Sequence, residues 1–346
     1  MIKGRLPWYM NGPDHRFWEN PDDLLTTNWL QQKGIYISKE TARDAIDVVA
    51  RDNSFHPVMD YLSRTEWDGV HRIDTWTIDY LGVEDTPFVR ATGAKWLISG
   101  VARIYVPGCK ADCALIIEGK QGLLKSTALK TLFHPWFTDE ISDLGSKDAA
   151  MQIAGKWGIE MSELDSMRRT EVSKVKAFMS RTMDRFRPPY GYRVVEQLRQ
   201  CIMAGTVNEN QYLRDDTGNR RFWPHAGTKI DIPKLSDDRD QLWAEAKTKY
   251  LLEEPWWLDS DELITQAREA QSARRVEDPW ENEISNMLKL LESTTPSELL
   301  LDLGKDKKDL TQADQNRAAS CLRALGWERK SIRYKGKPTW RYVPPM

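Results

Sequence analysis

The spacing of apolar residues changes along this chain, and each change predicts a different kind of structure. Over residues 1–105, apolar positions recur at helical spacing, as in ETARDAIDVVARD and TPFVRATGAKWLISGVARIY. Residues 106–230 alternate short β-like runs with helices, a pattern typical of α/β nucleotide-binding domains. We therefore expect an α/β fold, with an N-terminal helical domain at residues 1–105 and a core at residues 106–230.

Two further segments follow this core. Residues 231–278 have the pattern of acidic helices, RDQLWAEAKTKYLL and SDELITQAREAQSARR, and we expect them to form a lid or linker. Beyond Asp278 and Pro279, the pattern predicts three helices and then two strands around a turn at residues 335–337. This is the element order of a winged helix, so we expect residues 279–346 to form a winged-helix-like domain.

Composition indicates a globular protein and excludes the membrane-spanning and secreted classes. Hydrophobic residues make up 40% of the chain and charged residues 29%, and no apolar run approaches the roughly 18 residues of a membrane span. The N-terminus also lacks the apolar core of a signal peptide. The four cysteines are scattered without a histidine cluster, so neither zinc nor disulfides are expected. We predict a cytoplasmic protein that does not bind membranes.

The net charge of −2 conceals segments of opposite charge. Residues 167–193 carry eight Lys and Arg against two acids, and residues 311–346 again carry eight against two, whereas residues 231–283 carry fifteen acids against seven bases. A charge run is usually a solvated helix face. Both basic segments, however, contain interleaved aromatic residues, and this combination favours DNA as a partner. In the C-terminal domain, the candidate DNA-binding residues are Arg317, Lys335 and Lys337, with a protein-contact role for that domain as the alternative.

A nearly complete phosphate-binding loop follows the first apolar strand of the core. The segment ALIIEGKQGLLKSTALK, residues 114–130, matches G-x-x-x-x-G-K-[ST] except that Leu124 replaces the second glycine. Such a loop offers backbone N–H groups and a lysine to phosphates, and a hydroxyl to Mg²⁺, at the start of a helix. The motif therefore predicts ATP and Mg²⁺ as ligands. The candidate nucleotide-binding residues are Gly119, Gln121, Gly122, Lys125, Ser126 and Thr127.

Two more elements of an ATPase follow the loop. The segment KWGIEMSELD, residues 156–165, is strand-like and ends in acids, which suits it to hold Mg²⁺ and to activate water. We assign these roles to Glu163 before Glu160, with Ser126 as the other metal ligand; ordinary surface glutamates are the alternative. The segment RQCIMAGTVNENQYL, residues 199–213, predicts an apolar strand ending at Asn208, whose amide would orient the attacking water. A simple turn residue is the alternative for Asn208.

The order of these elements resembles that of superfamily 3 helicases, which are ring-forming ATPases of the AAA+ type. Four segments extend the likeness: WFTDEISDLGSKDAA, EMSELDSMRRTEVSKVKAFMSR, DRFRPPYGYRVVE and AGTVNENQYLRDDTGNRRFWP. They are similar to the virulence-associated E family of phage and genomic-island replication proteins. The resemblance covers residues 55–258 and is most specific at residues 212–224. A small-molecule kinase would also explain the loop, but it would not explain Asn208 or the two basic segments.

The resemblance implies an ATP-dependent DNA translocase or helicase that forms a hexameric ring and serves replication of a phage or mobile element. It places an arginine finger at Arg220 or Arg221, with Arg221 slightly favoured and a salt bridge to Asp215 or Asp216 as the alternative. It also places residues 185–193 in a hairpin within the ring channel, where cations and aromatic rings would grip a single strand. The candidate strand-binding residues are Lys174, Lys176, Arg187, Tyr190 and Arg193.

Two departures from the family pattern matter. Leu124 places a side chain where glycine normally allows close approach to the phosphates. An impaired ATPase site would make the protein a DNA-binding scaffold or an interference factor instead of a motor. Members of the family also often carry a primase-like region upstream of the core, and residues 1–105 are too few for one. We therefore expect a separate primase or replication initiator as a partner.

Overall fold

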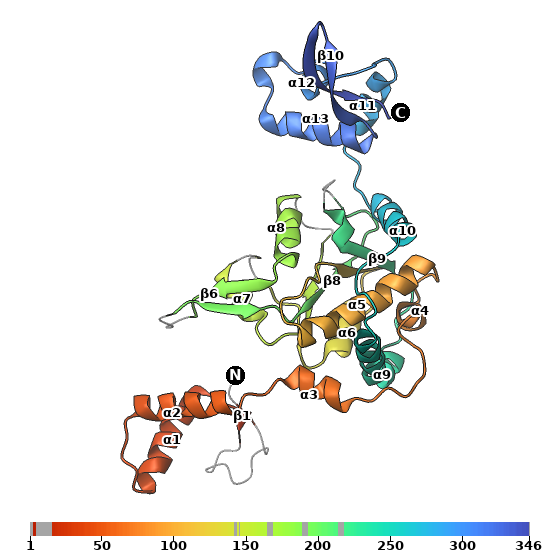
Figure 1. The fold of residues 1–346 in the computed structure, drawn as a ribbon. Coiled ribbons are helices and arrows are strands. Elements are labelled where there is room, and N and C mark those ends of the chain that lie inside the picture. Colours follow the sequence, from red (N-terminus) through yellow and green to blue (C-terminus); the bar gives the residue numbers. More distant parts are fainter. Residues whose placement is uncertain are drawn as a thin grey trace. The chain divides into compact units, whose positions relative to one another are not determined.

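The chain divides into two compact units, Met1–Tyr61 and Leu62–Met346. The computed structural model describes residues 3–4, 16–141, 144, 146–164, 169–188, 193–213 and 218–345. The first unit contains the paired strands β1 (Lys3–Gly4) and β2 (Arg16–Phe17), followed by helices α1 (Asn20–Gln32) and α2 (Lys39–Asp52) (Figure 1). Helix α3 (Pro57–Arg64) includes the boundary between the units. The helical N-terminus predicted from the sequence is confirmed.

A five-stranded parallel sheet forms the centre of the second unit. Its order is β4 (Phe137–Thr138), β5 (Gly158–Met161), β8 (Ile202–Val207), β3 (Ala114–Glu118) and β9 (Phe222–Ala226). All neighbouring strands are parallel. Every residue of β3 and β8 is buried, as expected for a sheet that is covered on both faces. The carboxyl ends of parallel strands meet at one edge of the sheet, so the segments that follow β3, β5 and β8 converge there.

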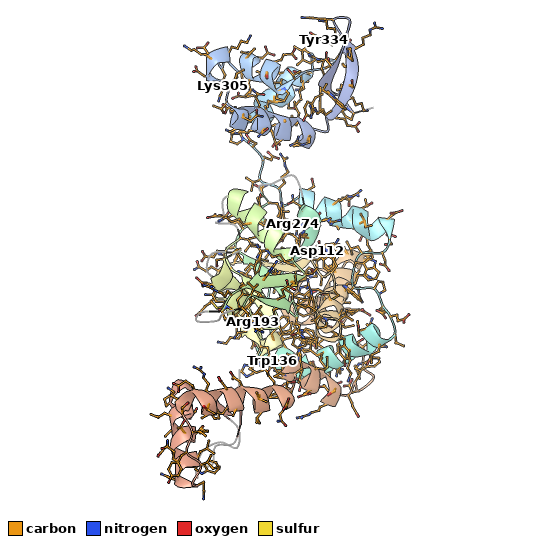
Figure 2. The ribbon with its side chains drawn as sticks, turned by 60° about the vertical axis from the view of Figure 1, so that its left-hand side comes forward. Asp112, Trp136, Arg193, Arg274, Lys305 and Tyr334 are labelled. Atoms are coloured by element: carbon orange, nitrogen blue, oxygen red, sulfur yellow. The ribbon has the colours of Figure 1, made fainter. Side chains whose placement is uncertain are left out.

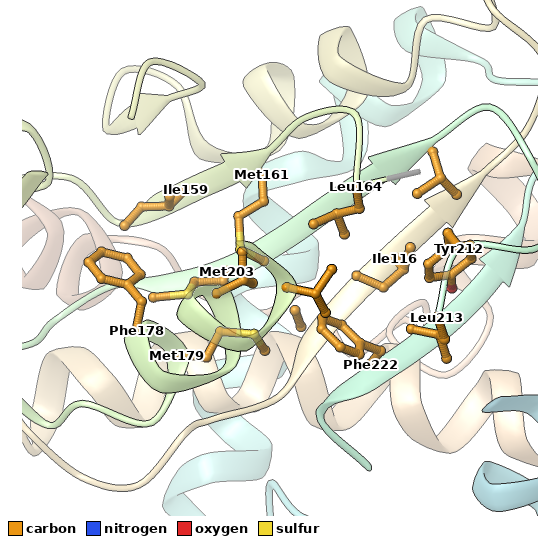
Figure 3. Close-up of a cluster of buried hydrophobic side chains, with 14 of the residues drawn as sticks. Ile116, Ile159, Met161, Leu164, Phe178, Met179, Met203, Tyr212, Leu213 and Phe222 are labelled. Carbon is orange, nitrogen blue, oxygen red and sulfur yellow. The ribbon is translucent and has the colours of Figure 1, made fainter. Parts of the chain in front are cut away.

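One face of this sheet packs against helices α7 (Lys147–Gln152) and α8 (Arg169–Met179). Side chains alternate between the two faces along a strand. Ile116, Ile159, Met203 and Phe222 therefore share this face and form one apolar cluster with Phe178 of α8 (Figure 3). The predicted α/β architecture is confirmed by this layer of helix on parallel sheet.

Helices α5 (Pro87–Tyr105) and α6 (Lys125–Phe133) contact the other face of the sheet, and α9 (Ile232–Leu251) packs against both helices. Trp96 of α5 donates its indole N–H to the carbonyl oxygen of Met203 at 2.8 Å, and Trp243 of α9 donates to that of Leu132 at 2.9 Å. The boundary expected at residue 105 therefore differs from the observed one after Tyr61. Helix α5 is buried on most of its surface, and it finds its partners in the sheet and α9. The short helix α4 (Trp76–Leu81) precedes it.

A separate hairpin is formed by β6 (Met183–Phe186) and β7 (Val195–Leu198), and Figure 1 shows it extending away from the parallel sheet. Its base is braced by a buried ion pair, in which Arg199 donates to the carboxylate of Asp184 at 2.6 and 2.8 Å. The same guanidinium lies 4.0 Å from the centroid of the Phe178 ring. The hairpin is therefore anchored to the core at one end. Helix α10 (Asp261–Ser272) follows α9 along the chain.

The last part of the chain has its own core. Its elements are α11 (Trp280–Leu288), α12 (Pro296–Asp302), the 3-10 turn η2 (Lys307–Asp309), α13 (Gln312–Ala324), β10 (Glu328–Tyr334) and β11 (Lys337–Val343). The strands pair antiparallel around Lys335 and Gly336, both with positive φ, as a tight hairpin turn requires. Thr294 adds an antiparallel bridge to Tyr342 of β11. The predicted order of three helices and two strands is thus observed.

Within the described ranges, none of the helices combines the length and hydropathy of a membrane span.

Candidate nucleotide-binding site

The loop between β3 and α6 lies at the carboxyl edge of the sheet and depends on glycine. Gly119 has φ 153°, and a β-carbon there would meet Leu123 Cδ2 at 2.5 Å and the carbonyl oxygen of Gly227 at 3.0 Å. Gly122 has φ 83°, a left-handed conformation that L side chains rarely adopt. The side chain that packs over the start of the loop is therefore that of Leu123.

Leu124 stands at the position of the missing glycine and keeps the conformation of a glycine. Its φ and ψ are 68° and 27°, in the left-handed region, and it is the N-cap of helix α6. This conformation costs a residue with a β-carbon roughly 1–2 kcal/mol. The side chain is 52% exposed, so it does not fill a gap in the core.

Lys125 is enclosed by the loop. Its ammonium group donates to the carbonyl oxygens of Gly119 and Lys120 at 2.6 and 3.0 Å, and to the side-chain oxygen of Asn208 at 3.0 Å. Asn208 directly follows β8, the strand next to β3 in the sheet. The structure thus brings together the lysine of the loop and the asparagine that the sequence pattern singled out.

Ser126 joins the loop to the acidic strand. Its hydroxyl donates to Glu160 Oε1 at 2.7 Å, and Thr206 of β8 donates to the same oxygen at 2.6 Å. Glu160 is 1% exposed, and its other carboxylate oxygen, Oε2, is buried without a hydrogen bond to any residue that the structure describes. Mg²⁺ takes oxygen ligands, of which usually only one or two are protein side chains. A buried carboxylate oxygen without a hydrogen bond, close to a serine hydroxyl, fits such an ion.

The two candidate glutamates lie in different surroundings. Glu160 lies within β5 and alternates onto the α6 side of the sheet, which brings it to Ser126. Glu163 follows the strand, is exposed, and has φ 54°. The carboxylate beside the serine hydroxyl therefore belongs to Glu160, because the phase of the strand selects it. Gln121 and Thr127 are exposed on the loop and on the first turn of α6.

A second polar group supports the start of the loop from the opposite side of β3. Glu118 is 1% exposed and accepts hydrogen bonds from Arg274 at 2.8 and 2.9 Å and from the Tyr212 hydroxyl at 3.0 Å. Burial and the neighbouring Glu118 carboxylate raise the pKa of Tyr212 well above its usual value. The backbone N–H groups of Tyr212 and Leu213 both donate to the Arg274 carbonyl oxygen at 3.0 Å. This network ties the last residue of β3 to the segment that leads out of the core.

Sequence patterns indicated neither this network nor the hydrogen bond from Thr206 to Glu160. Glu118 and Arg274 are 156 residues apart along the chain, and nothing local links them. Thr206 lies two residues before Asn208, so the alternation of a strand offered a signal that we missed.

The two candidate finger arginines differ in their surroundings. Both precede β9 in the 3-10 turn η1 (Asn219–Arg221). The Arg221 side chain is 18% exposed, lies 3.5 Å from the Asp112 carboxylate, and donates to the Ser180 hydroxyl at 3.0 Å. The Arg220 side chain is 69% exposed and lies 3.8 Å from the same carboxylate. Asp215 and Asp216, the expected salt-bridge partners, lie outside the described residues.

The predicted strand-binding residues of the core separate into two groups. Lys176 is buried and donates to the side-chain oxygen of Asn219 at 2.8 Å, so it supports the turn that carries the arginines. Lys174 on α8, Arg187 after β6 and Arg193 before β7 are exposed, and Arg193 is labelled in Figure 2. Tyr190 lies outside the described residues.

Arg317 is engaged with residues at the start of the C-terminal part. It donates to the Asp278 carboxylate through two hydrogen bonds of 2.8 Å and lies 3.9 Å from the Trp280 ring centroid. Lys335 and Lys337 are exposed at the turn of the β10–β11 hairpin, where Tyr334 is labelled in Figure 2.

Taken together, a parallel sheet, a glycine-containing loop that begins a helix, and converging lysine, glutamate and asparagine side chains define a P-loop NTPase-like α/β domain. Its sequence matches the virulence-associated protein E-like domain over residues 62–276, more than half of the chain. The chain therefore belongs to the virulence-associated protein E-like family.

The other comparisons give no further information on the function of this chain. No curated protein matches the chain. Among solved structures, "The apo structure of NrS-1 C terminal region (305-718)" is 15% identical, with a TM-score of 0.45, covering 82% of this chain and 77% of the other. A second structure, "The A form apo structure of NrS-1 C terminal region-CTR", is 13% identical, with a TM-score of 0.45, covering 82% and 78%.

Proposed function

We propose that this protein is an ATP-dependent DNA translocase or helicase in the replication of a phage or mobile element, and that it acts as a hexameric ring. One observation carries the proposal: Lys125 hydrogen-bonds Asn208 while the next residue, Ser126, hydrogen-bonds Glu160. A cation for phosphates, an amide for water and a carboxylate for a metal ion thus converge at one edge of the sheet. The order of the sheet, in which β8 separates the loop strand from the acidic strand, agrees with an AAA+-like core.

The roles of the residues follow from these contacts. Lys125 would exchange its contacts with the Gly119 and Lys120 carbonyl oxygens for the β- and γ-phosphates of ATP, and the start of α6 would offer N–H groups to them. That movement would free the side-chain oxygen of Asn208 to accept a hydrogen bond from the attacking water and so orient it. Binding and hydrolysis are thereby coupled through one lysine.

Ser126 and Glu160 are the residues that would hold Mg²⁺. When bound, the metal ion would neutralise charge that develops on the phosphates. Thr206 orients the Glu160 carboxylate by donating to Oε1, which leaves Oε2 directed away from that contact. Glu163 lies three residues further along, outside the strand, and has no role at the metal site in this proposal.

Arg220 is the better finger in this proposal, and Arg221 supports it. A finger must reach the nucleotide of a neighbouring subunit, which requires an exposed guanidinium. Arg220 meets that requirement, whereas Arg221 is held by Ser180 and Asp112. This reverses the slight preference for Arg221 that the sequence suggested.

DNA would contact the protein at two places. In the core, the exposed Lys174, Arg187 and Arg193 would follow the backbone of a single strand through the ring. In the C-terminal domain, three helices, the Thr294 bridge and the basic β10–β11 hairpin support a winged helix that binds duplex DNA. Removing residues 279–346 should then reduce the salt dependence of duplex binding, and an unchanged slope would make the domain a protein-contact module.

A second function is favoured by one observation, the left-handed conformation of Leu124. A strained, side-chain-bearing residue next to the lysine would slow hydrolysis, and the protein would then act as a DNA-binding scaffold or interference factor that uses nucleotide only for assembly. A separate primase or initiator is the expected partner in either case.

The test measures steady-state ATP hydrolysis with and without single-stranded DNA, together with the mass of the assembly. A motor should hydrolyse ATP faster on DNA and form hexamers with ATP and Mg²⁺. Assembly on DNA without stimulated hydrolysis would establish the scaffold function and refute the motor.

A further inference from the structure

A cavity of about 380 Å³ lies beside the phosphate loop. Ala226, the last residue of β9, lines it and pairs in register with Glu118, the last residue of β3. The next residue, Gly227, donates its N–H to the Glu118 carbonyl oxygen at 2.9 Å, and its own carbonyl oxygen faces Gly119. The cavity and the loop are thus neighbours at the same edge of the sheet.

The cavity has apolar walls and one unsatisfied polar atom. Phe88, Val89 and Pro224 form the apolar part of the lining. The volume of the cavity lies in the roughly 300–1,000 Å³ range of small-molecule sites. Gln266 of α10 also lines the cavity, and its side-chain oxygen is buried without a hydrogen bond to any of the described residues. An acceptor that is buried and unpaired is destabilising, which points to a donor supplied by a ligand.

We propose that this cavity binds the adenine base and ribose of the nucleotide whose phosphates occupy the loop; the proposal rests on the nucleotide-binding function given above. Phosphates are disfavoured inside, because Glu84 and Glu269 line the cavity and Arg274, which also lines it, is neutralised by Glu118. The same carboxylates accept hydrogen bonds from ribose hydroxyls.

The unpaired amide oxygen selects the base. A glutamine amide pairs with adenine, accepting from the amino group and donating to a ring nitrogen. Guanine presents a carbonyl oxygen where adenine carries its amino group, so two acceptors would face each other at Gln266. The site should therefore prefer ATP to GTP.

The experiment separates the base from the phosphates by comparing ATP, GTP and inorganic tripolyphosphate in calorimetric titrations with Mg²⁺. Gln266→Leu removes the acceptor at similar volume, and we expect it to weaken ATP about three- to ten-fold, the loss of one hydrogen bond, while tripolyphosphate binds as before. The preference for ATP over GTP should shrink by the same factor. Arg268→Leu, on an exposed position of the same helix and outside the cavity, is the matched control and should change nothing.

A second variant keeps the proposal testable if Gln266→Leu alone does not change ATP binding. Ala270→Phe fills the cavity from α10 and should abolish ATP binding while tripolyphosphate still binds. If Lys125→Ala weakens the binding of both ligands, yet Gln266→Leu and Ala270→Phe bind ATP like wild type, the base lies elsewhere and this inference is wrong. If wild type binds neither ATP nor tripolyphosphate, the nucleotide function itself fails and the inference falls with it.

Discussion

Leu124→Gly tests whether the departure from the phosphate-loop pattern impairs the enzyme. Leu124 adopts a conformation with φ 68° and is 52% exposed at the start of α6. Glycine adopts the same backbone conformation without strain and removes a branched side chain from the approach to Lys125. The substitution therefore changes the loop without leaving a buried void.

Three contributions to stability nearly cancel. Relief of the left-handed conformation gains roughly 1–2 kcal/mol. The greater freedom of glycine in the unfolded chain costs roughly 0.5–1 kcal/mol. Losing a leucine side chain that is about half buried costs about 1 kcal/mol, half of a typical full burial. The free energy of unfolding should therefore change by less than about 1 kcal/mol, and any change in activity then reports on the site.

The assay is steady-state ATP hydrolysis by Leu124→Gly beside wild type. We expect turnover to rise about ten-fold, because restored N–H contacts that stabilise the transition state by 1.4 kcal/mol give that factor. Leu124→Ala keeps the β-carbon and the strained backbone but removes the bulk. An equal gain in the alanine variant would assign the effect to bulk alone, and equal or lower turnover in the glycine variant would refute the claim that Leu124 impairs the site.

Three further predictions concern single side chains. Glu160→Gln should reduce hydrolysis at least ten-fold and weaken its Mg²⁺ dependence, whereas Glu163→Gln should have a small effect; the reverse order in a Mg²⁺ titration would restore the ranking from the sequence. Arg220→Ala should leave ATP binding intact, and in rings mixed with wild type the loss of hydrolysis should exceed the fraction of mutant subunits. A loss equal to that fraction would argue against a site shared between subunits. Arg221→Ala should instead lower the melting temperature. Burial lowers the pKa of His225 to about 3, so between pH 6.5 and 3 this imidazole takes up a proton only in the unfolded chain. The stability that His225 contributes to the folded state above pH 6.5 is therefore lost as the pH falls. From pH 7 to 5 this amounts to about 2 kcal/mol, which His225→Gln should abolish in denaturant titrations.

The sequence predicted the features that depend on local order along the chain. The α/β core follows from the change in apolar periodicity, and the position of Asn208 directly after a strand was predicted from the apolar run before it. The loop residues could be read because Gly119, Lys125 and Ser126 stand at fixed spacing in one segment.

Features set by packing between distant segments were not predictable. The choice between Glu160 and Glu163 depends on which strand residues face α6, and that phase is fixed by the sheet. Lys176 and Arg317 counted as basic residues in the charge pattern, but charge counts do not tell which cations are already paired inside the fold. The packing of α5 was hidden for a related reason, since its apolar surface does not reveal that α9 is one of its partners.

The central claim is that the loop, Glu160 and Asn208 form one magnesium–nucleotide site, and the affinity for ATP with and without Mg²⁺ tests it most directly. Wild type should bind ATP more tightly when Mg²⁺ is present, and Lys125→Ala should weaken binding about ten- to hundred-fold, the loss of one or two charge-assisted hydrogen bonds. An unchanged affinity in a Lys125→Ala protein that melts like wild type would contradict the account and place the nucleotide elsewhere.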